Sequence, residues 1–328
     1  MTTSDYIGSF FACKENVDTQ LSSKDLIVKD NRLIEASYRL DLAEQRLVLL
    51  AIAEARESGE KVTAETWLEV SAKTYVDTFG LSRTTGYKVL KQAADNLFNR
   101  WMQLRGIDGR TGKEVLVKTR WVSACMYVDQ AALVRLQIAP VVIPYISNLE
   151  SRFTAYQLKN VSQMTSFYAI RLYELLAQYK TISTRSIDLV ELKEFLGATE
   201  KAYERMDNFK KKVLDLSVNQ VNQFTDLMIS YESVKSGRSI SGYIFKIQCK
   251  DSAKSTIKPK LTTSAENSKR PVLSTEISLG ERSLLRQLVK KTGRSEDDLL
   301  TEAKALALSN KHDDILIALD SMMKQSNN

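Results

Sequence analysis

The stretch from Phe79 to Arg100 reads FGLSRTTGYKVLKQAADNLFNR and predicts a turn that leads into a helix. Gly80 can adopt the positive φ that a tight turn between helices needs, and Ser82 is a favoured N-cap residue. Apolar residues recur with a 3.6-residue period on one side: Tyr87, Leu90, Ala93, Ala94 and Leu97. Short polar side chains, amides and lysines occupy the other: Thr84, Thr85, Lys88, Lys91, Gln92 and Asp95. Such a mixture suits contacts with phosphates and base edges.

Residues 70–78 read as a short amphipathic helix just upstream, so the two helices together predict a helix-turn-helix. The alternative is an ordinary amphipathic surface helix. The same order recurs in the second half of the chain, which favours DNA binding. There, residues 165–180 predict a helix and residues 188–195 a second short helix that Gly197 closes. A long helix with a cationic start follows from Arg205.

This second long helix is expected to have one packed side and one polar side. The packed side contains Phe209, Val213, Leu216, Ser217 and Val221, joined by Leu214 and Val218. The polar side contains Lys211, Lys212, Asp215, Asn219 and Asn222. Lys210, Lys211 and Lys212 could be a solvated charge run. At the N-terminal end of a helix, however, three lysines oppose the helix dipole, and an anionic partner would relieve that repulsion.

Each long helix is followed by an expected β-hairpin. Residues 100–105 and 114–127 flank a Gly/Asp-rich turn, and a hairpin directly after a recognition-type helix is expected to be the wing of a winged helix. Its basic residues are Arg105, Arg110, Lys113, Lys118 and Arg120. Residues 106–114 do not form a phosphate-binding loop, because Glu114 stands where Ser or Thr is required. The second hairpin joins 227–231 to 243–247 through a turn at 235–238.

Composition narrows the function classes. The 328 residues are 43% apolar and 27% charged, with a net charge of +7, which fits a soluble protein of two or three domains with polyanionic partners. Three distant cysteines without a CxxC pair indicate a reducing compartment, so a cytoplasmic location is expected, with no membrane segment. The one histidine, His312, disfavours His-based catalytic triads and excludes multi-His metal sites. We expect no catalytic residues, cofactor or metal.

These features predict an α+β fold of two tandem winged-helix domains plus a small C-terminal helical segment. The expected parts are a mobile arm (1–24), winged-helix domain 1 (25–148), winged-helix domain 2 (149–249), a basic linker (250–274) and a helical module (275–328).

In domain 1, residues 26–28 predict a short strand and Lys29–Asn31 a turn. Asp41 and Glu44 form a capping box that opens a long helix. In the tail, Ser278, Ser295 and Gly293 predict helix boundaries, and Leu284, Leu288, Leu299, Leu300, Leu306 and Leu316 a small core.

Five motifs together resemble one family, the iteron-binding plasmid replication initiators, or Rep family, which includes the F-plasmid initiator. They are LIVKDN (26–31), LDLAEQRL (40–47), SFYAIRLYELL (166–176), NFKKKVL (208–214) and GRSISGYIF (237–245). The resemblance implies two winged helices that bind directly repeated origin sequences (iterons) as a monomer. It also implies a dimer that represses the protein's own gene at an inverted repeat. Host initiator, helicase and chaperones would be partners. Residues 83–91 and 208–212 match the family's recognition helices, and residues beyond about 270 lie outside the shared core.

The expected partner is therefore double-stranded DNA. The candidate DNA-binding residues are Arg83, Thr84, Thr85, Lys88, Lys91, Arg110, Lys113, Arg205, Asn208, Lys210, Lys211, Lys212, Asn219, Lys235 and Arg238. Two alternatives stay open. One is a winged-helix transcription repressor with no replication role. The other is a DNA nickase or recombinase that uses one of the thirteen tyrosines, which the single histidine and the absence of a carboxylate cluster disfavour.

Overall fold

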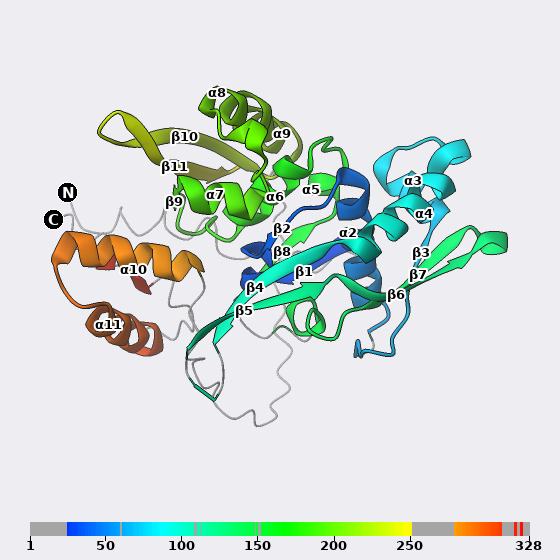
Figure 1. The fold of residues 1–328 in the computed structure, drawn as a ribbon, viewed down its shortest axis with the longest axis horizontal. Coiled ribbons are helices and arrows are strands. Elements are labelled where there is room, and N and C mark those ends of the chain that lie inside the picture. The colour runs from blue at the N-terminus through cyan, green and yellow to red at the C-terminus, as the bar shows by residue number, and fades with distance from the viewer. Residues whose placement is uncertain are drawn as a thin grey trace, which may run out of the picture. The chain divides into compact units, whose positions relative to one another are not determined.

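The computed structural model describes residues 25–59, 61–107, 110–111, 113–147, 149, 152–250, 279–309, 318–319 and 322–323. The chain divides into two compact units, Met1–Gln248 and Cys249–Asn328. The larger unit contains both helices and strands, and the described part of the smaller unit consists mainly of helices (Figure 1). The expected arm (1–24), all but the first residue of the expected linker, and His312 lie outside the described residues. None of the helices in the described ranges is long and apolar enough to cross a membrane.

The first half of the larger unit contains the first helix-turn-helix. In chain order its elements are β1 (Leu26–Asp30), α1 (Asn31–Ile34), β2 (Ser37–Tyr38), α2 (Leu42–Glu57), β3 (Leu68–Ser71), α3 (Ala72–Phe79), α4 (Arg83–Asn99), β4 (Trp101–Ile107), β5 (Glu114–Arg120), β6 (Val122–Val128), η2 (Asp129–Ala131) and β7 (Leu133–Ile138). The capping box is confirmed, since Asp41 Oδ1 and Glu44 Oε2 each accept the other residue's backbone N–H at 2.8 Å. The turn is confirmed too, with Gly80 at φ 64°.

The wing of this domain is not the predicted hairpin. β3, β7 and β6 form one antiparallel sheet, and the helices α3 and α4 pack on it, so the hairpin β6–β7 is the wing. The predicted hairpin exists as β4–β5, but it pairs with β2 in another sheet, where Ser37 lies opposite Gln103. The prediction was wrong because residues 114–127, taken as one strand, break at Trp121 into two strands of different sheets.

The second half repeats the order of elements. They are η3 (Ile143–Tyr145), β8 (Phe153–Gln157), α5 (Lys159–Ser162), α6 (Phe167–Ala177), β9 (Thr184–Asp188), α7 (Leu189–Leu196), η4 (Lys201–Tyr203), α8 (Met206–Phe209), η5 (Lys210–Asp215), α9 (Leu216–Phe224), β10 (Leu227–Ser236) and β11 (Ser239–Cys249). Gly197 ends α7 at φ 68° and Gly237 turns the hairpin at φ 63°, as predicted. The hairpin joins β9 in the sheet order β10-β11-β9 and is the second wing.

The second long helix differs from the prediction at its centre. The elements α8, η5 and α9 follow one another without a break, and η5 is a π-helical turn. Phe209, Val213 and Val221 are buried as predicted. Leu216 was predicted to pack with them, but its side chain is 41% exposed. The prediction was wrong because it assumed a uniform α-helical period, whereas the i→i+5 bonds of a π turn accommodate one additional residue.

A buried polar junction joins the two halves of the larger unit. β1 pairs antiparallel with β8, and Lys29, predicted to lie in a turn, is in β1 with its side chain wholly buried. Its ammonium group lies 2.6 Å from Glu174 Oε1 on α6. Arg171, also on α6, donates to the carbonyl of Ala36 at 3.0 Å and to the hydroxyl of Tyr38. These contacts fix the first strands of the chain against the helical core of its second half.

The smaller unit contains two described helices, α10 (Leu279–Thr292) and α11 (Glu296–Ser309). Gly293 lies between them at φ 68°, and the backbone N–H of Asp298 donates to Ser295 Oγ at 3.2 Å, so these two predicted boundaries are confirmed. Its core consists of Leu285, Leu288, Leu299, Ala303, Ala318, Leu319 and Met322. Leu284, Leu300 and Leu306 pack against it, while Leu316 lies outside the described residues.

Candidate nucleic-acid interface

The first recognition-type helix, α4, depends on one glycine for its position. A Cβ atom on Gly86 would lie 2.2 Å from Val76 Cγ2 of α3, so a larger residue here would displace the Val76 side chain or move the two helices apart. Arg83 and Lys88 are exposed on α4, and Arg83 Nη2 lies 4.0 Å from an Asp77 carboxylate oxygen. The side chains of Thr84 and Thr85 lie outside the described residues.

The side chain of Asp129 connects the first wing, β6–β7, to α4. The hydroxyl of Tyr87 donates to Asp129 Oδ1 at 2.7 Å, and Lys91 Nζ lies 3.2 Å from the same oxygen. These contacts, the hydrogen bond first, hold the pKa of Asp129 below its usual value, so the carboxylate is charged at neutral pH. A basic first wing was predicted, whereas the structure places an anion at its tip.

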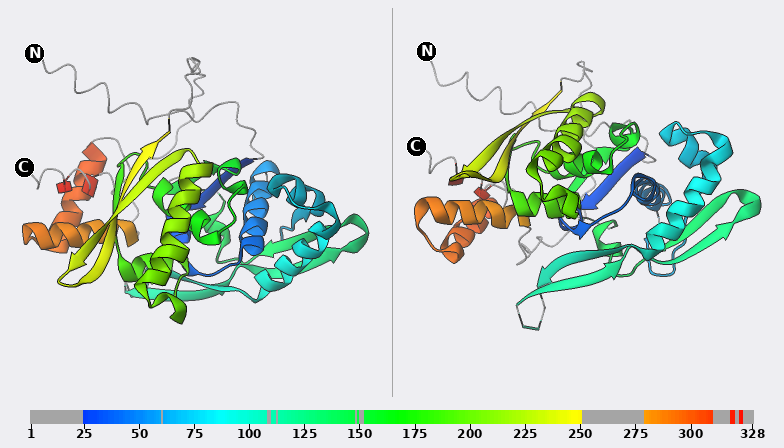
Figure 2. Two further views of the ribbon diagram at one scale, coloured as in Figure 1. Left: turned by 90° about the horizontal axis from the view of Figure 1, so that it is seen from above. Right: turned by 45° about the horizontal axis from the view of Figure 1, so that its top comes forward.

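Two candidate residues are separated from this helix. Arg110 and Lys113 are exposed between β4 and β5, two strands that run away from α3 and α4 (Figures 1 and 2). The structure therefore does not bring them together with Arg83, Lys88 and Lys91. The same hairpin carries exposed Trp101, with Lys118 Nζ 4.2 Å from the centre of its indole ring. Sequence reasoning did not single out Trp101.

The second recognition-type helix carries the densest positive charge. Lys210, Lys211 and Lys212 are exposed, and within the described part of the chain their ammonium groups form no ion pair. Arg205 is exposed at the N-cap of α8 and pairs with Asp207 at 2.9 Å. Asn208 donates to the carbonyl oxygen of Ala202 at 3.2 Å, which leaves its side-chain oxygen as an acceptor.

Two polar residues of this helix have a structural role that sequence reasoning missed. Asn222 exchanges hydrogen bonds with the backbone of Ile229 in β10, at 2.9 Å as donor and 2.6 Å as acceptor. Asp215 accepts from the hydroxyl of Tyr231 in the same strand. Both were predicted on the polar face, and both instead fix the helix to the sheet that carries the second wing.

The remaining candidate residues lie on α9 and on the hairpin to which this helix is attached. Asn219 is exposed on α9, and Lys235 and Arg238 are exposed around the β10–β11 turn. The three lysines of the helix therefore belong to the same domain as Lys235 and Arg238 of its wing. Figure 1 shows this hairpin, β10–β11, beside α8 and α9. The second domain therefore has the arrangement in which a helix can enter a major groove while a basic wing reaches a phosphate backbone.

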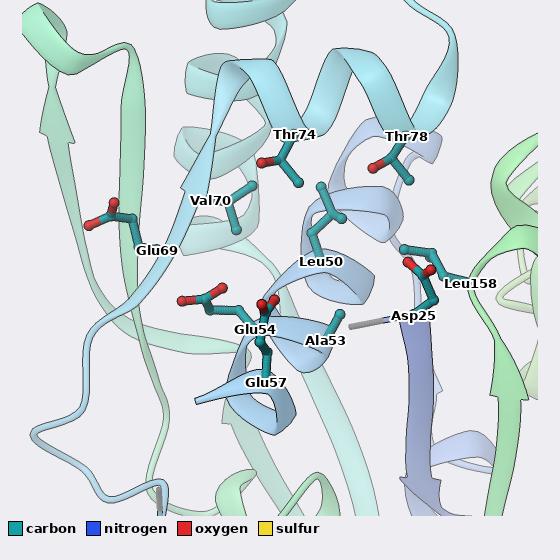
Figure 3. Close-up of a pocket in the computed structure, with 10 residues that line it drawn as sticks. All are labelled: Asp25, Leu50, Ala53, Glu54, Glu57, Glu69, Val70, Thr74, Thr78 and Leu158. Atoms are coloured by element: carbon teal, nitrogen blue, oxygen red, sulfur yellow. The ribbon is translucent and has the colours of Figure 1, made fainter. Parts of the chain in front are cut away.

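A pocket behind the first helix-turn-helix has the opposite charge (Figure 3). Its volume is about 210 Å³, and Leu50 and Val70 form part of an apolar wall. Four acidic residues also line it: Asp25, Glu54, Glu57 and Glu69. Carboxylates repel phosphate, so the lining of this pocket disfavours contact with a nucleic acid. Among the described residues, no group of His, Cys, Asp or Glu side chains is arranged to hold a metal ion.

Comparisons with known proteins agree with this architecture. A family model described as "Initiator Replication protein, WH1" matches residues 26–177, and one described as "Initiator Rep protein, WH2" matches residues 188–247. An uncharacterized 27.6 kDa protein of Escherichia coli is 24% identical over 238 residues, which are 70% of this chain and 98% of that protein.

Two solved structures are also similar. The Pi initiator protein, solved in complex with iteron DNA, has 20% identity and a TM-score of 0.57, over 71% of this chain and all of that one, and so shares the fold. The WH1 domain of a replication protein isolated from a multiple sclerosis patient is 44% identical over 39% of this chain and 97% of that one, with a TM-score of 0.33. By its two matched winged-helix domains, this chain belongs to the replication initiator (Rep) proteins.

Proposed function

We propose that this protein starts replication of a plasmid by binding iterons, the direct repeats of an origin, through its two winged helices. The observation that carries the proposal is the second recognition helix, on which Lys210, Lys211 and Lys212 face solvent without an ion pair in the described residues. Uncompensated ammonium groups clustered on one helix attract a polyanion and release its counterions when they bind it.

The buried junction supports the use of both domains on one site. Arg185 Nη2 lies 2.8 Å from Glu35 Oε1, with both side chains buried, and adds a second ion pair to that of Lys29 and Glu174. Since these pairs join the halves, α4 and the helix α8–α9 would meet one DNA duplex as parts of a single body. Arrays of bound protein would strain adjacent A·T-rich DNA and recruit the host initiator, helicase and chaperones. Initiation in this proposal is non-enzymatic.

The proposal includes a dimer that represses the protein's own gene at an inverted repeat. β5 supports it, since in the sheet order β2-β4-β5 it is an outer strand. Its residues Leu116 and Val117 are exposed, and an outer strand with exposed apolar side chains can pair with a second copy of itself. Sedimentation of the free protein over a range of concentrations tests this part separately from DNA binding.

Binding to direct repeats cloned from beside the gene, in gel shifts at several salt concentrations, tests the main proposal. We expect one discrete complex per repeat, resistant to competitor DNA. A smear that disappears at modest salt would leave only a basic protein. A plasmid that replicates from its origin without this gene would support the repressor instead. A covalent adduct with supercoiled origin DNA would support a nickase.

A further inference from the structure

The π-helical turn η5 determines which side chains of the second recognition helix face solvent. Its additional residue rotates everything after it by about 100° relative to a continuous α-helix. In a continuous α-helix, Leu216 would follow Phe209 and Val213 at i+7 and i+3 and point into the core. With the π turn it is 41% exposed, while Phe209 and Val213 stay fully buried.

The rotation places Leu216 on the polar side of the helix. Lys212 precedes it by about one turn, and Asn219 and Gln223 follow at i+3 and i+7; all three are exposed. On the opposite side Ser217 and Val221 are buried. Asp215 and Asn222, which bond to β10, hold this rotation in place. Leu216 is thus an apolar side chain in the middle of the face that the proposed function turns toward DNA.

Only one group in the major groove is chemically matched to a leucine. Base edges there present hydrogen-bond donors and acceptors, which Leu216 cannot satisfy, and the C5-methyl group of thymine, which it can cover. The flanking Lys212 and Asn219 can contact phosphates or polar base atoms on either side. We infer that Leu216 is a specificity-determining residue that packs against the methyl group of one thymine in the binding site. This inference rests on the proposed function.

Replacing single thymines by uracils tests the contact, because the exchange removes the methyl group and keeps every hydrogen-bonding atom of the base. The probe is a duplex selected by the full-length protein from a random library. Affinities are measured for the wild type and Leu216→Ala on the selected duplex and on a set in which each thymine in turn is uracil. Leu216 is exposed, so its truncation is not expected to unfold the helix, and a thermal melt verifies this.

We expect the uracil exchange and the Leu216→Ala substitution to remove the same contact, so that their losses of DNA affinity do not add. For the wild type, one uracil position lowers affinity by about fourfold, the value of one buried methyl group. Leu216→Ala binds the selected duplex more weakly by at least this factor and loses nothing further at that position. Leu216→Met, which keeps an apolar contact, retains a preference for thymine there. Met228→Ala, which truncates a 44% exposed side chain of β10, leaves the whole uracil profile unchanged.

Two results would overturn the inference. One is a Leu216→Ala variant whose uracil profile equals that of the wild type at every position. The other is an undiminished affinity of Leu216→Ala for the selected duplex, together with altered self-association, which would make Leu216 a contact between copies. If the wild-type protein selected no particular sequence from the library, the proposed function would be contradicted as well. The selection is done before any variant is made, so this outcome is distinguished from failure of the inference about Leu216.

Discussion

Lys29 and Glu174 form an ion pair of 2.6 Å with neither side chain exposed to solvent, although 145 residues separate them in the chain. The pair joins β1 to α6. Burial lowers the pKa of the Lys29 amine, which the Glu174 carboxylate partly opposes. Tyr156 donates its hydroxyl proton to the same carboxylate oxygen at 2.5 Å, so the lysine and the tyrosine share one acceptor. The attachment of the two halves depends on this small network.

Removing one partner of the pair is expected to be costly. Lys29→Met leaves the Glu174 carboxylate buried without its lysine and should lower the free energy of unfolding by about 3–5 kcal/mol. Adding Glu174→Leu removes the carboxylate but leaves the buried guanidinium of Arg171, 3.6 Å from Glu174 Oε2 in the wild type, without its acidic partner, so the double variant should recover only part of the loss. Urea unfolding of the wild type, the single variant and the double variant measures both effects. A loss below about 1 kcal/mol for Lys29→Met would mean that water reaches the pair.

Two glycines provide a matched test of the junction. Gly80 and Gly197 both end helices with positive φ, at 64° and 68°. A Cβ on Gly80 would meet no atom within 4 Å, whereas on Gly197 it would lie 2.6 Å from the carbonyl oxygen of Tyr38. Gly80→Ala should therefore cost about 1–2 kcal/mol from the left-handed backbone alone. Gly197→Ala should cost about 1–3 kcal/mol more, because the backbone of β2 must move. Equal costs in thermal unfolding would contradict the contact.

Local signals in the sequence were sufficient for the helices and their ends. The capping box at Asp41 and Glu44 and the glycines at 80, 197 and 237 act within a few residues, so a pattern along the chain predicts them. The winged-helix architecture followed from the repeated order of elements. The structure describes the side chains of the candidate DNA-binding residues except Thr84 and Thr85, but the contacts of all fifteen with DNA remain a prediction.

Non-local pairing accounts for most of what was missed. The hairpins β4–β5 and β6–β7 both alternate apolar and polar residues, and only their partners, β2 and β3, decide which one is the wing. Nothing near Lys29 in the sequence indicates Glu174 as its partner. The π turn was missed for another reason, since the spacing of Phe209, Val213 and Val221 suits a continuous α-helix.

The salt dependence of DNA binding distinguishes the role of one lysine. Lys211→Ala should weaken binding, and if Lys211 contacts a phosphate, the slope of log K against log salt should become shallower by about 0.9 for all DNA sequences. A loss confined to certain sequences would identify a base contact instead. Lys61→Ala, in the loop between α2 and β3, removes the same charge from an exposed position and serves as the control. No loss with Lys211→Ala would remove this residue from the interface.

The acid on the first wing is expected to oppose binding. Asp129 is 69% exposed and holds Lys91 at 3.2 Å, so Asp129→Asn should both free the ammonium group and remove a charge that repels phosphate. We expect a higher affinity and a steeper salt dependence, by about one phosphate contact, in fluorescence anisotropy. Asp297→Asn, on α11 in the smaller unit, makes the same change in net charge. An equal gain from both variants would show a general charge effect rather than a local one.

The π turn in the second recognition helix also bears on how proteins of this kind diverge. Deleting one codon between positions 210 and 215 would return the segment to α-helical bonding and rotate the part beyond it by about 100° relative to α8. Leu216 would then point toward the core, while Ser217 and Val221, which are now buried, would turn away from it. Different side chains would thus face the DNA, although none of them had been replaced. A single small deletion or insertion in this turn is thus a short mutational route from one origin sequence to another.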